Sequence, residues 1–386
     1  MRIVMFYHSA VSDWNHGNAH FLRGIATELV ARGHDVRIYE PSNSWSLQNL
    51  LAEHGQAAII KFRAHYPDLK VFRYDSNSLK LQQALDGADL VIVHEWNDPE
   101  LVARMGRYHQ KHTDFCLLFH DTHHRSVTAP ESMAQYDLSD FDGVLAYGAS
   151  IREVYLRNGW SANVWVWHEA ADTRIFHPWP SGSSEYREYA NGNGSRSKSY
   201  DGDLVWIGNW GDEERTTEIK EFLIDPVKEL GLKARVYGVR YPTPAMKELT
   251  DAGIEYAGWL PNFEVPGVFG RFRLTVHIPR RPYVCALPGI PTIRPFEALA
   301  CGIPLISAYW NDSERLFRPG RDYLVARDGQ EMRRHMRALL DNPAWAQELA
   351  EHGRQTILQR HTCAHRAEAL LSIYRRSDTL AQGVLA

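Results

Sequence analysis

The sequence predicts an α/β protein of two domains, each with a parallel sheet covered by helices on both faces. The first observation is length, because 386 residues exceed one typical core and fit two domains of about 150–200 residues. The second is the alternation of short apolar runs with helix-length segments, which occurs before residue 178 and again after residue 202. The third is the stretch between them, 178–202, whose Pro, Gly, Ser and Asn content predicts a linker or mobile loop.

The first domain, expected over residues 1–177, starts with an apolar strand at 2–8. A polar loop, an amphipathic helix near 18–32 and a second strand at 36–39 complete a β-loop-α-β unit. Further apolar runs are bounded by polar or turn residues, as buried parallel strands are, and lie at 89–94, 115–120, 143–147 and 163–167. These spacings predict a doubly wound, Rossmann-like domain.

The second domain, expected over residues 203–360, repeats this alternation. Its predicted strands lie at 203–207, 234–238, 254–257, 273–278 and 303–307. Its predicted helices lie at 213–224, 244–252, around Glu297, 329–341 and 343–358. The last segment, 361–386, holds an amphipathic helix near 363–376, which we expect to pack back on the first domain. Ligands bind at the carboxyl ends of parallel strands, so a cleft between two facing sheets is the expected site.

Composition narrows the class of protein. A hydrophobic content of 44% and a charged content of 23% are typical of globular proteins, and the net charge of −4 gives no indication of a nucleic-acid partner. The apolar start is too short for a signal peptide, and no run approaches the roughly 18 apolar residues of a membrane span. We therefore expect a cytoplasmic protein without a transmembrane segment. The four cysteines are far apart in sequence, which favours reduced, structural thiols.

The segment from Pro288 to Ser307 is the most informative part of the chain. Prolines stiffen a loop, Thr292 is placed to cap a short helix that contains Glu297, and a buried-type strand follows. The unpaired N–H groups of a helix N-terminus bind a diphosphate, so we expect Thr292 and Ile293 to contact one. Glu297, one turn further on, is placed to accept hydrogen bonds from a ribose diol. The alternative is an ordinary loop, helix and strand in which Glu297 is merely solvated.

Two arginines are candidates for stabilising the charge of a leaving diphosphate. Arg215 follows the glycine-containing loop that includes Gly208 and Asn209, and Arg294 lies at the start of the Glu297 helix. The alternative for Arg215 is an ion pair with a neighbouring glutamate, at position 213, 214 or 218.

Three polar clusters follow strands of the first domain and are expected on the substrate-binding side of its sheet. His120, Asp121 and Glu95 are the candidates for a catalytic base, with His120 preferred. The other candidates for this side are His16, Gly17, Asn18, His94 and His123. A metal site is the alternative, but the histidines and carboxylates are adjacent in sequence rather than spaced four apart on a helix, so no metal is expected.

Four segments of the second half look like the CgeB-type, group-1 (GT4-like) glycosyltransferases of the GT-B fold, and they lie at 207–215, 291–302, 316–326 and 361–366. The segments 17–36 and 167–178 are similar to these enzymes more loosely. The resemblance implies two Rossmann-like domains and metal-independent transfer of a sugar from a nucleoside diphosphate donor of the UDP, dTDP or GDP type, with no cofactor. It also implies that the nucleobase lies near Trp259 and Leu260, and that the three polar clusters of the first domain are on the acceptor side.

One departure from this family concerns the donor sugar. Related retaining enzymes carry two glutamates separated by seven residues; Glu297 matches the second, but Gly289 occupies the position of the first. We therefore expect backbone amides of the loop around Gly289 to contact the sugar, and inversion or retention stays open. The acceptor also stays open among a glycan, a lipid-linked molecule, a protein and a small molecule. The alternatives are a non-catalytic nucleotide-sugar-binding protein or partner subunit, and a nucleotide-sugar epimerase, which needs no acceptor.

Overall fold

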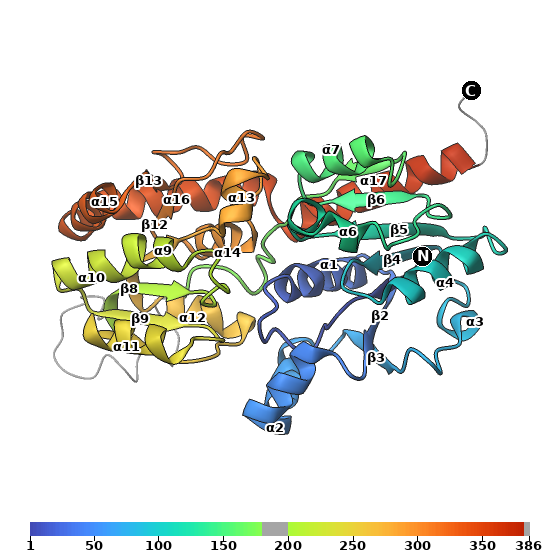
Figure 1. The fold of residues 1–386 in the computed structure, drawn as a ribbon, viewed down its shortest axis with the longest axis horizontal. Helices are drawn as coiled ribbons and strands as arrows, with labels where there is room; N and C mark the ends of the chain where they lie inside the picture. Colours follow the sequence, from blue (N-terminus) through green and yellow to red (C-terminus); the bar gives the residue numbers. More distant parts are fainter. Residues whose placement is uncertain (180–199, 382–386) are drawn as a thin grey trace. The chain divides into compact units, whose positions relative to one another are not determined.

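The computed structural model describes residues 1–179 and 200–381. Most of the expected linker, 178–202, lies outside the described residues. The chain divides into two compact units (Figure 1). The N-terminal unit comprises 1–172, 285–290 and 362–386, and the C-terminal unit comprises 173–284 and 291–361.

The N-terminal unit is built on a seven-stranded parallel sheet with the order β3-β2-β1-β4-β5-β6-β7. Its central strands are wholly buried because helices cover both faces, which is why they read as apolar runs. The strands are β1 Arg2–Phe6, β2 Asp35–Pro41, β3 Lys70–Tyr74, β4 Leu90–His94, β5 Cys116–Asp121, β6 Gly143–Ala146 and β7 Val164–Val166.

The helices of this unit include one long element that the sequence pattern did not predict. This is α2, Trp45–His65, which is interrupted at Gly55 (φ 61°) and leads to the equally unpredicted β3. The other helices are α1 Ala19–Ala31, α3 Leu81–Ala84, α4 Pro99–His109, α5 Arg125–Thr128, α6 Pro130–Met133, α7 Ala149–Asn158 and α17 Cys363–Ala381.

Helix α17, at the end of the chain, packs against α1 near its start. Gly24 of α1 has no room for a side chain, because a Cβ there would lie 2.5 Å from Sγ of Cys363 and 2.8 Å from Cβ of Asp172. Trp167 donates from Nε1 to the carbonyl of Arg366 at 2.9 Å. The final helix is therefore an integral part of the N-terminal unit.

The C-terminal unit is built on a six-stranded parallel sheet with the order β10-β9-β8-β11-β12-β13. The strands are β8 Gly202–Ile207, β9 Ala234–Tyr237, β10 Ile254–Tyr256, β11 Phe272–His277, β12 Leu305–Ala308 and β13 Leu324–Ala326. The helices are α9 Thr216–Ile219, the π-helical η1 Lys220–Ile224, α10 Asp225–Leu230, α11 Thr243–Asp251, the 3₁₀ turn η2 Asn262–Glu264, α12 Val265–Phe269, α13 Arg281–Cys285, α14 Ile293–Cys301, α15 Gly329–Asp341 and α16 Pro343–Arg360.

Two local expectations for this unit are wrong. The helix predicted over 213–224 begins only at Thr216, because Asp212 and Glu213 have positive φ angles of 50° and 69°, and it continues as a π-helix. Thr292 occupies the N-cap position of α14, but its side chain makes no capping hydrogen bond. With φ at 61° and ψ at −177°, its backbone lies outside the usual N-cap conformation.

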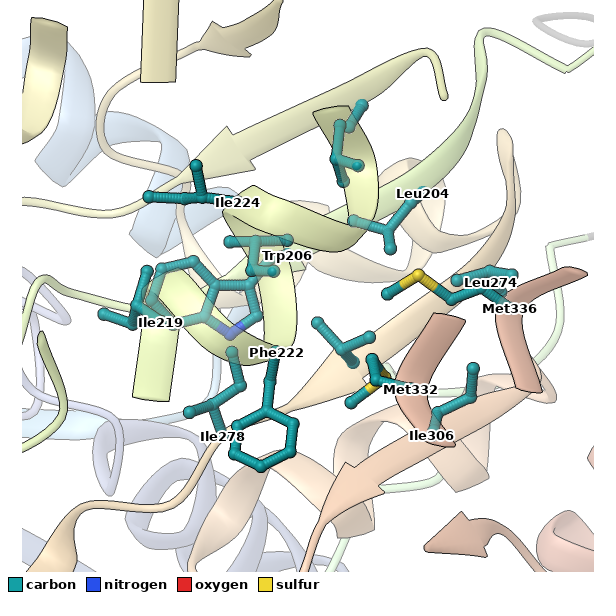
Figure 2. Close-up of a cluster of buried hydrophobic side chains, with 14 of the residues drawn as sticks. Leu204, Trp206, Ile219, Phe222, Ile224, Leu274, Ile278, Ile306, Met332 and Met336 are labelled. Carbon is teal, nitrogen blue, oxygen red and sulfur yellow. The ribbon is translucent and has the colours of Figure 1, made fainter. Parts of the chain in front are cut away.

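One face of the C-terminal sheet is covered by a dense apolar cluster (Figure 2). Trp206 of β8, Leu274 of β11 and Ile306 of β12 meet side chains from η1 and from α15, including Phe222 and Met332. Residues 273, 275 and 277 of β11 alternate with this apolar set and therefore point to the opposite face. The period-2 alternation thus places His277 away from the cluster.

Replacing Leu274 with alanine should lower the free energy of unfolding by about 2–5 kcal/mol, because the side chain is fully buried and its removal leaves a cavity. Chemical denaturation of the purified protein measures this change. Leu358→Ala, on an exposed site of α16, is the matched control and should change stability by no more than about 0.5 kcal/mol. Equal losses in the two variants would contradict the assigned core.

Candidate active site

Polar side chains gather at the carboxyl ends of three neighbouring strands in the N-terminal unit. His94 ends β4 and His120 lies beside it on β5, in register. Tyr7 follows β1 and stacks on His94 with ring centroids 4.6 Å apart. The structure thus brings together two of the sequence-predicted clusters and adds Tyr7, which the sequence did not single out because it ends an apolar strand.

His120 is completely buried, and its two ring nitrogens have different environments. Nδ1 lies 2.6 Å from the hydroxyl of Tyr7. Nε2 has no hydrogen-bond partner among the described residues, and the ring contacts Trp167 at a centroid distance of 4.8 Å. Burial lowers the pKa of His120 to about 3, so the imidazole is neutral at physiological pH.

Glu95 is buried and held by its neighbours through both carboxylate oxygens. Nη2 of Arg125 donates to Oε2 at 2.8 Å, and the amide of Thr122 donates to Oε1 at 3.1 Å. The guanidinium of Arg125 also lies 4.1 Å from the ring centroid of Trp96. Burial raises the pKa of Glu95, and the Arg125 charge opposes that rise. Glu95 is therefore tied to Arg125, and its role as a base stays a prediction.

Asp121, the third candidate base, has partners on both oxygens. The hydroxyl of Tyr155 donates to Oδ2 at 2.9 Å, and the amide of His123 donates to Oδ1 at 3.0 Å. Burial and the nearby charge of Glu95 raise the pKa of Asp121 well above its usual range. This shift favours the protonated form of Asp121, which cannot act as a base. The role of Asp121 as a base stays a prediction.

The remaining acceptor-side candidates lie around Thr122. Asn18 donates to Oγ1 of Thr122 at 2.5 Å, and Nε2 of His94 lies 2.9 Å from the same oxygen. The ring of His16 lies 6.5 Å from that of His94. Gly17 is exposed and His123 is half-buried. The structure therefore assembles residues from three separate parts of the sequence around one hydroxyl.

The loop that carries His16 is fixed by two buried charges. Glu40 of β2 accepts hydrogen bonds from the amides of Ala10 (2.8 Å) and Val11 (3.1 Å). Arg23 of α1 donates to the carbonyls of the same two residues at 2.8 and 2.9 Å and pairs with Asp13 at 2.8 Å. These contacts satisfy the loop backbone away from water and hold its conformation.

In the C-terminal unit, Arg215 is held at the carboxyl end of the sheet. Its Nη1 donates to the carbonyl of Ile278 at 2.9 Å and its Nη2 to that of Asn209 at 2.5 Å. Nε is buried without a hydrogen-bond partner in the described part of the chain. Burial, together with the charges of Arg280 and Arg294, lowers the pKa of Arg215 to about 9. Three cationic groups are therefore concentrated here.

The carboxylates near this cluster are engaged with other arginines. Glu214 pairs with Arg280 at 2.8 Å, and Glu218 pairs with Arg281 at 3.1 Å. Glu297, fully buried on α14, pairs with Nη1 of Arg294 three residues earlier. Ile293, the first residue of α14, is also buried. The two donor-binding candidates Arg294 and Glu297 are therefore partners of each other.

Two loops meet beside Arg215 at the ends of β8 and β9. A Cβ at Gly238 would lie 2.1 Å from the carbonyl oxygen of Gly208, so the backbones approach too closely for a side chain. Oδ1 of Asn209 accepts from the amide of Val239 at 2.9 Å. These contacts fix the loop at Gly208 and Asn209.

The other donor-side candidates lie in two further segments of the chain. Trp259 and Leu260 are half-buried in the loop after β10. Gly289 belongs to the segment 285–290, which groups with the N-terminal unit. The structure thus collects Gly208, Asn209, Arg215, Arg294 and Glu297 in the C-terminal unit, together with His277 and Arg280, which were not predicted.

Each unit matches a known enzyme domain. Residues 17–175 match the family described as Glycosyltransferase Family 4, and residues 215–372 match the family described as glycosyl transferase-like. The protein is a glycosyltransferase with the GT-B fold. The two matches assign this glycosyltransferase to group 1, and neither identifies the CgeB-type subfamily.

Solved structures share the fold over nearly the whole glycosyltransferase chain. HepE from Anabaena in complex with UDP has a TM-score of 0.67 at 15% identity, covering 97% of this chain and 100% of that one. Sucrose-phosphate synthase from Thermosynechococcus elongatus has a TM-score of 0.62 at 15% identity, covering 97% and 98%. A glycosyltransferase from Rickettsia africae has a TM-score of 0.64 at 11% identity, with the same coverage. A comparison with curated proteins finds no match.

Within residues 1–179 and 200–381, no group of three or more His, Cys, Asp or Glu side chains is arranged to hold a metal ion. None of the helices there combines the length and the apolar character needed to cross a membrane.

The neutral state of His120 predicts a pH dependence of stability. The unfolded chain binds a proton at this histidine below a pH of about 6.5, whereas the folded chain does not until a pH of about 3, so stability falls as the pH falls between these values. From about pH 7.5 to about pH 5.5, the wild type should lose about 1.4 kcal/mol more than His120→Asn. Denaturant unfolding at both pH values measures the difference.

The matched control for this measurement is His65→Asn, on an exposed site of α2, which should follow the wild type. The assignment of a buried neutral imidazole would be wrong if the His120 variant and the wild type lost the same stability over this range.

Proposed function

We propose that this glycosyltransferase holds a nucleoside diphosphate sugar in its C-terminal unit and transfers the sugar to an acceptor hydroxyl at the histidine-rich strand ends of its N-terminal unit, without a metal ion. The observation that carries the proposal is the cluster of Arg215, Arg280 and Arg294 at the carboxyl end of the second sheet. Guanidinium groups bind phosphate oxygens in a bidentate manner, and charge on the leaving diphosphate grows as the glycosidic bond breaks.

The donor is proposed to be of the UDP type. The support is that HepE, a neighbour with the same fold, is solved in complex with UDP, with UDP and glucose, and with UDP-glucose. The dTDP and GDP types remain in the test below, because the candidate base contacts at Trp259 and Leu260 are not specific for one base.

Glu297 and Arg294 are proposed to act on the donor together. Arg294 uses Nη1 for Glu297 and makes no other hydrogen bond within residues 1–179 and 200–381, so we propose that its other guanidinium nitrogens bind phosphate oxygens. Glu297 is fully buried and both orients Arg294 and accepts a hydrogen bond from a ribose hydroxyl in this proposal. The pair therefore couples recognition of the ribose to recognition of the diphosphate.

On the acceptor side, His120 is the preferred group for the acceptor proton. Nε2 of its neutral imidazole has no hydrogen-bond partner among the described residues and can accept a hydrogen bond from the acceptor hydroxyl, whereas Glu95 is bound by Arg125 and Asp121 has a raised pKa. His94 lies beside His120, and His16 lies beside His94. These two histidines, together with Asn18 at Thr122 and His123 at Trp96, are proposed to contact the acceptor.

Glu297→Ala should weaken nucleoside diphosphate binding by about 1–3 kcal/mol, because Arg294 and the ribose hydroxyl both lose a hydrogen-bond partner. Thermal-shift and calorimetric titrations with UDP, dTDP, GDP, CMP and NAD measure it. Glu351→Ala, on the exposed face of α16, is the control and should bind like the wild type. Stabilisation by one nucleoside diphosphate, lost in the Glu297 variant, would support the proposal, and a folded variant with unchanged affinity would remove the ribose assignment.

Metal independence predicts that excess EDTA leaves the rate of sugar transfer unchanged, because the arginine cluster neutralises the diphosphate. The test is informative because phage T4 BGT, a neighbour with a TM-score of 0.57, is solved in complex with UDP and Mn²⁺. Release of nucleoside diphosphate from the sugar donor, followed with EDTA and with added Mn²⁺ or Mg²⁺, checks it. A rate that EDTA abolishes and Mn²⁺ restores would show that the proposal of metal-free transfer is incorrect.

A further inference from the structure

A histidine that the sequence did not single out lies among the groups of the proposed donor site. His277 ends β11 and is only 3% exposed. It pairs in register with Ser307 on β12, and its Nδ1 lies 2.9 Å from Oγ of that serine. Neither residue belongs to the apolar cluster, and both alternate along their strands with its members Val276 and Ile306, so their side chains point to the opposite face of the sheet.

The hydrogen bonds around Ser307 determine which nitrogen of His277 carries the proton. The hydroxyl of Ser307 has one hydrogen, which it donates to the carbonyl of Ala308 at 2.7 Å. Toward His277 the serine oxygen is therefore an acceptor, so Nδ1 carries the ring proton. In a neutral ring, Nε2 then presents a lone pair.

The ring stays neutral because of its surroundings. Burial and the positive charges of Arg215 and Arg294 lower the pKa of His277 to about 3. Nε2 is buried and has no hydrogen-bond partner among the described residues. The protein therefore keeps a hydrogen-bond acceptor without a donor at this position. Selection for packing alone favours an apolar side chain here, because a buried polar atom without a partner is destabilising.

Arg215, by contrast, presents a hydrogen-bond donor without an acceptor among the described residues. Arg215 is anchored through Nη1 to the carbonyl of Ile278, the residue that follows His277, and its Nε is a buried donor without a partner. Phosphate oxygens only accept hydrogen bonds, so a diphosphate suits Arg215 but offers nothing to Nε2 of His277. The complementary ligand carries a hydroxyl group next to its phosphates.

We infer that His277 recognises a hydroxyl of the sugar nucleotide, either on the ribose or on the transferred sugar, by accepting its hydrogen bond at Nε2. This inference rests on the proposed function and assigns a specificity-determining residue to the same site. Ser307 is the positioning residue, because it fixes the tautomer that leaves Nε2 as an acceptor.

The experiment measures the affinities of UDP, 2′-deoxy-UDP and UDP-glucose for the full chain by calorimetry. His277→Asn keeps an amide donor near the Nδ1 position but has no group at Nε2, whereas His277→Gln places an amide oxygen near Nε2. His277→Asn should lose about tenfold in affinity for UDP-glucose, and His277→Gln should retain most of it. Ser307→Ala should lose several-fold, because the ring is then free to place its proton on Nε2. This variant also tests the inference if the His277 variants fail to fold.

The ligand series identifies the hydroxyl. A loss for UDP-glucose alone assigns a sugar hydroxyl, and a loss for UDP and UDP-glucose that is absent for 2′-deoxy-UDP assigns the ribose 2′-hydroxyl. A loss for all three that His277→Gln repairs assigns the 3′-hydroxyl. All three results support the inference.

Other outcomes overturn the inference. Folded His277→Asn and Ser307→Ala proteins with unchanged affinities for all three ligands would do so while leaving the proposed function intact. A uniform loss that His277→Gln does not repair would assign His277 to structure alone. If the wild type binds none of the uridine ligands, the guanosine ligands GDP, 2′-deoxy-GDP and GDP-glucose or the thymidine ligands dTDP and dTDP-glucose replace them. A wild type that binds none of the three series contradicts the proposed function and the inference together.

Discussion

The constraint on which both units depend is that all strands of each sheet are parallel. Every strand of a sheet then ends at the same edge, and the residues that follow the strands meet there. In the N-terminal unit this edge collects Tyr7, His94 and His120 from three strands, and in the C-terminal unit it collects Arg215 and His277 from two. Side chains on neighbouring strands become partners although Tyr7 and His120 are 113 residues apart in sequence.

Burial then determines the charge of each edge. At the N-terminal edge it keeps the histidines neutral: the pKa of His94 falls well below its usual range because of burial and the adjacent histidines. At the C-terminal edge Arg280 and Arg294 each pair with a carboxylate. Among the described residues, Arg215 instead donates to two carbonyl oxygens, lies over the Trp206 ring and leaves its Nε without a hydrogen-bond partner. Burial, with the charges of Arg280 and Arg294, lowers the pKa of Arg215, and a bound anion would offset that repulsion, so an anionic ligand would stabilise this edge.

The architecture could be predicted from the sequence because its signals are local. Buried central strands give apolar runs, and the helix with Glu297 is preceded by prolines and followed by Gly302. The edge strand β3 was missed for the same reason: it contains Lys70 and Arg73 on exposed positions, so it has no apolar run. The Arg294–Glu297 pair follows from a spacing of three on one helix and could have been predicted.

The candidate site could be predicted only in part, because its decisive contacts join distant segments. No sequence pattern indicates that Glu95 contacts Arg125, 30 residues later. His277 was not recognised as a site residue because it ends an apolar run. Once these contacts are known, the two edges have complementary chemistry. The edge with His120 contains neutral imidazoles and a carboxylate already paired with an arginine, which suits an uncharged hydroxyl. The edge with Arg215 has excess positive charge, which suits a departing diphosphate. Sugar transfer needs both environments, since the attacking group is neutral and the leaving group becomes anionic.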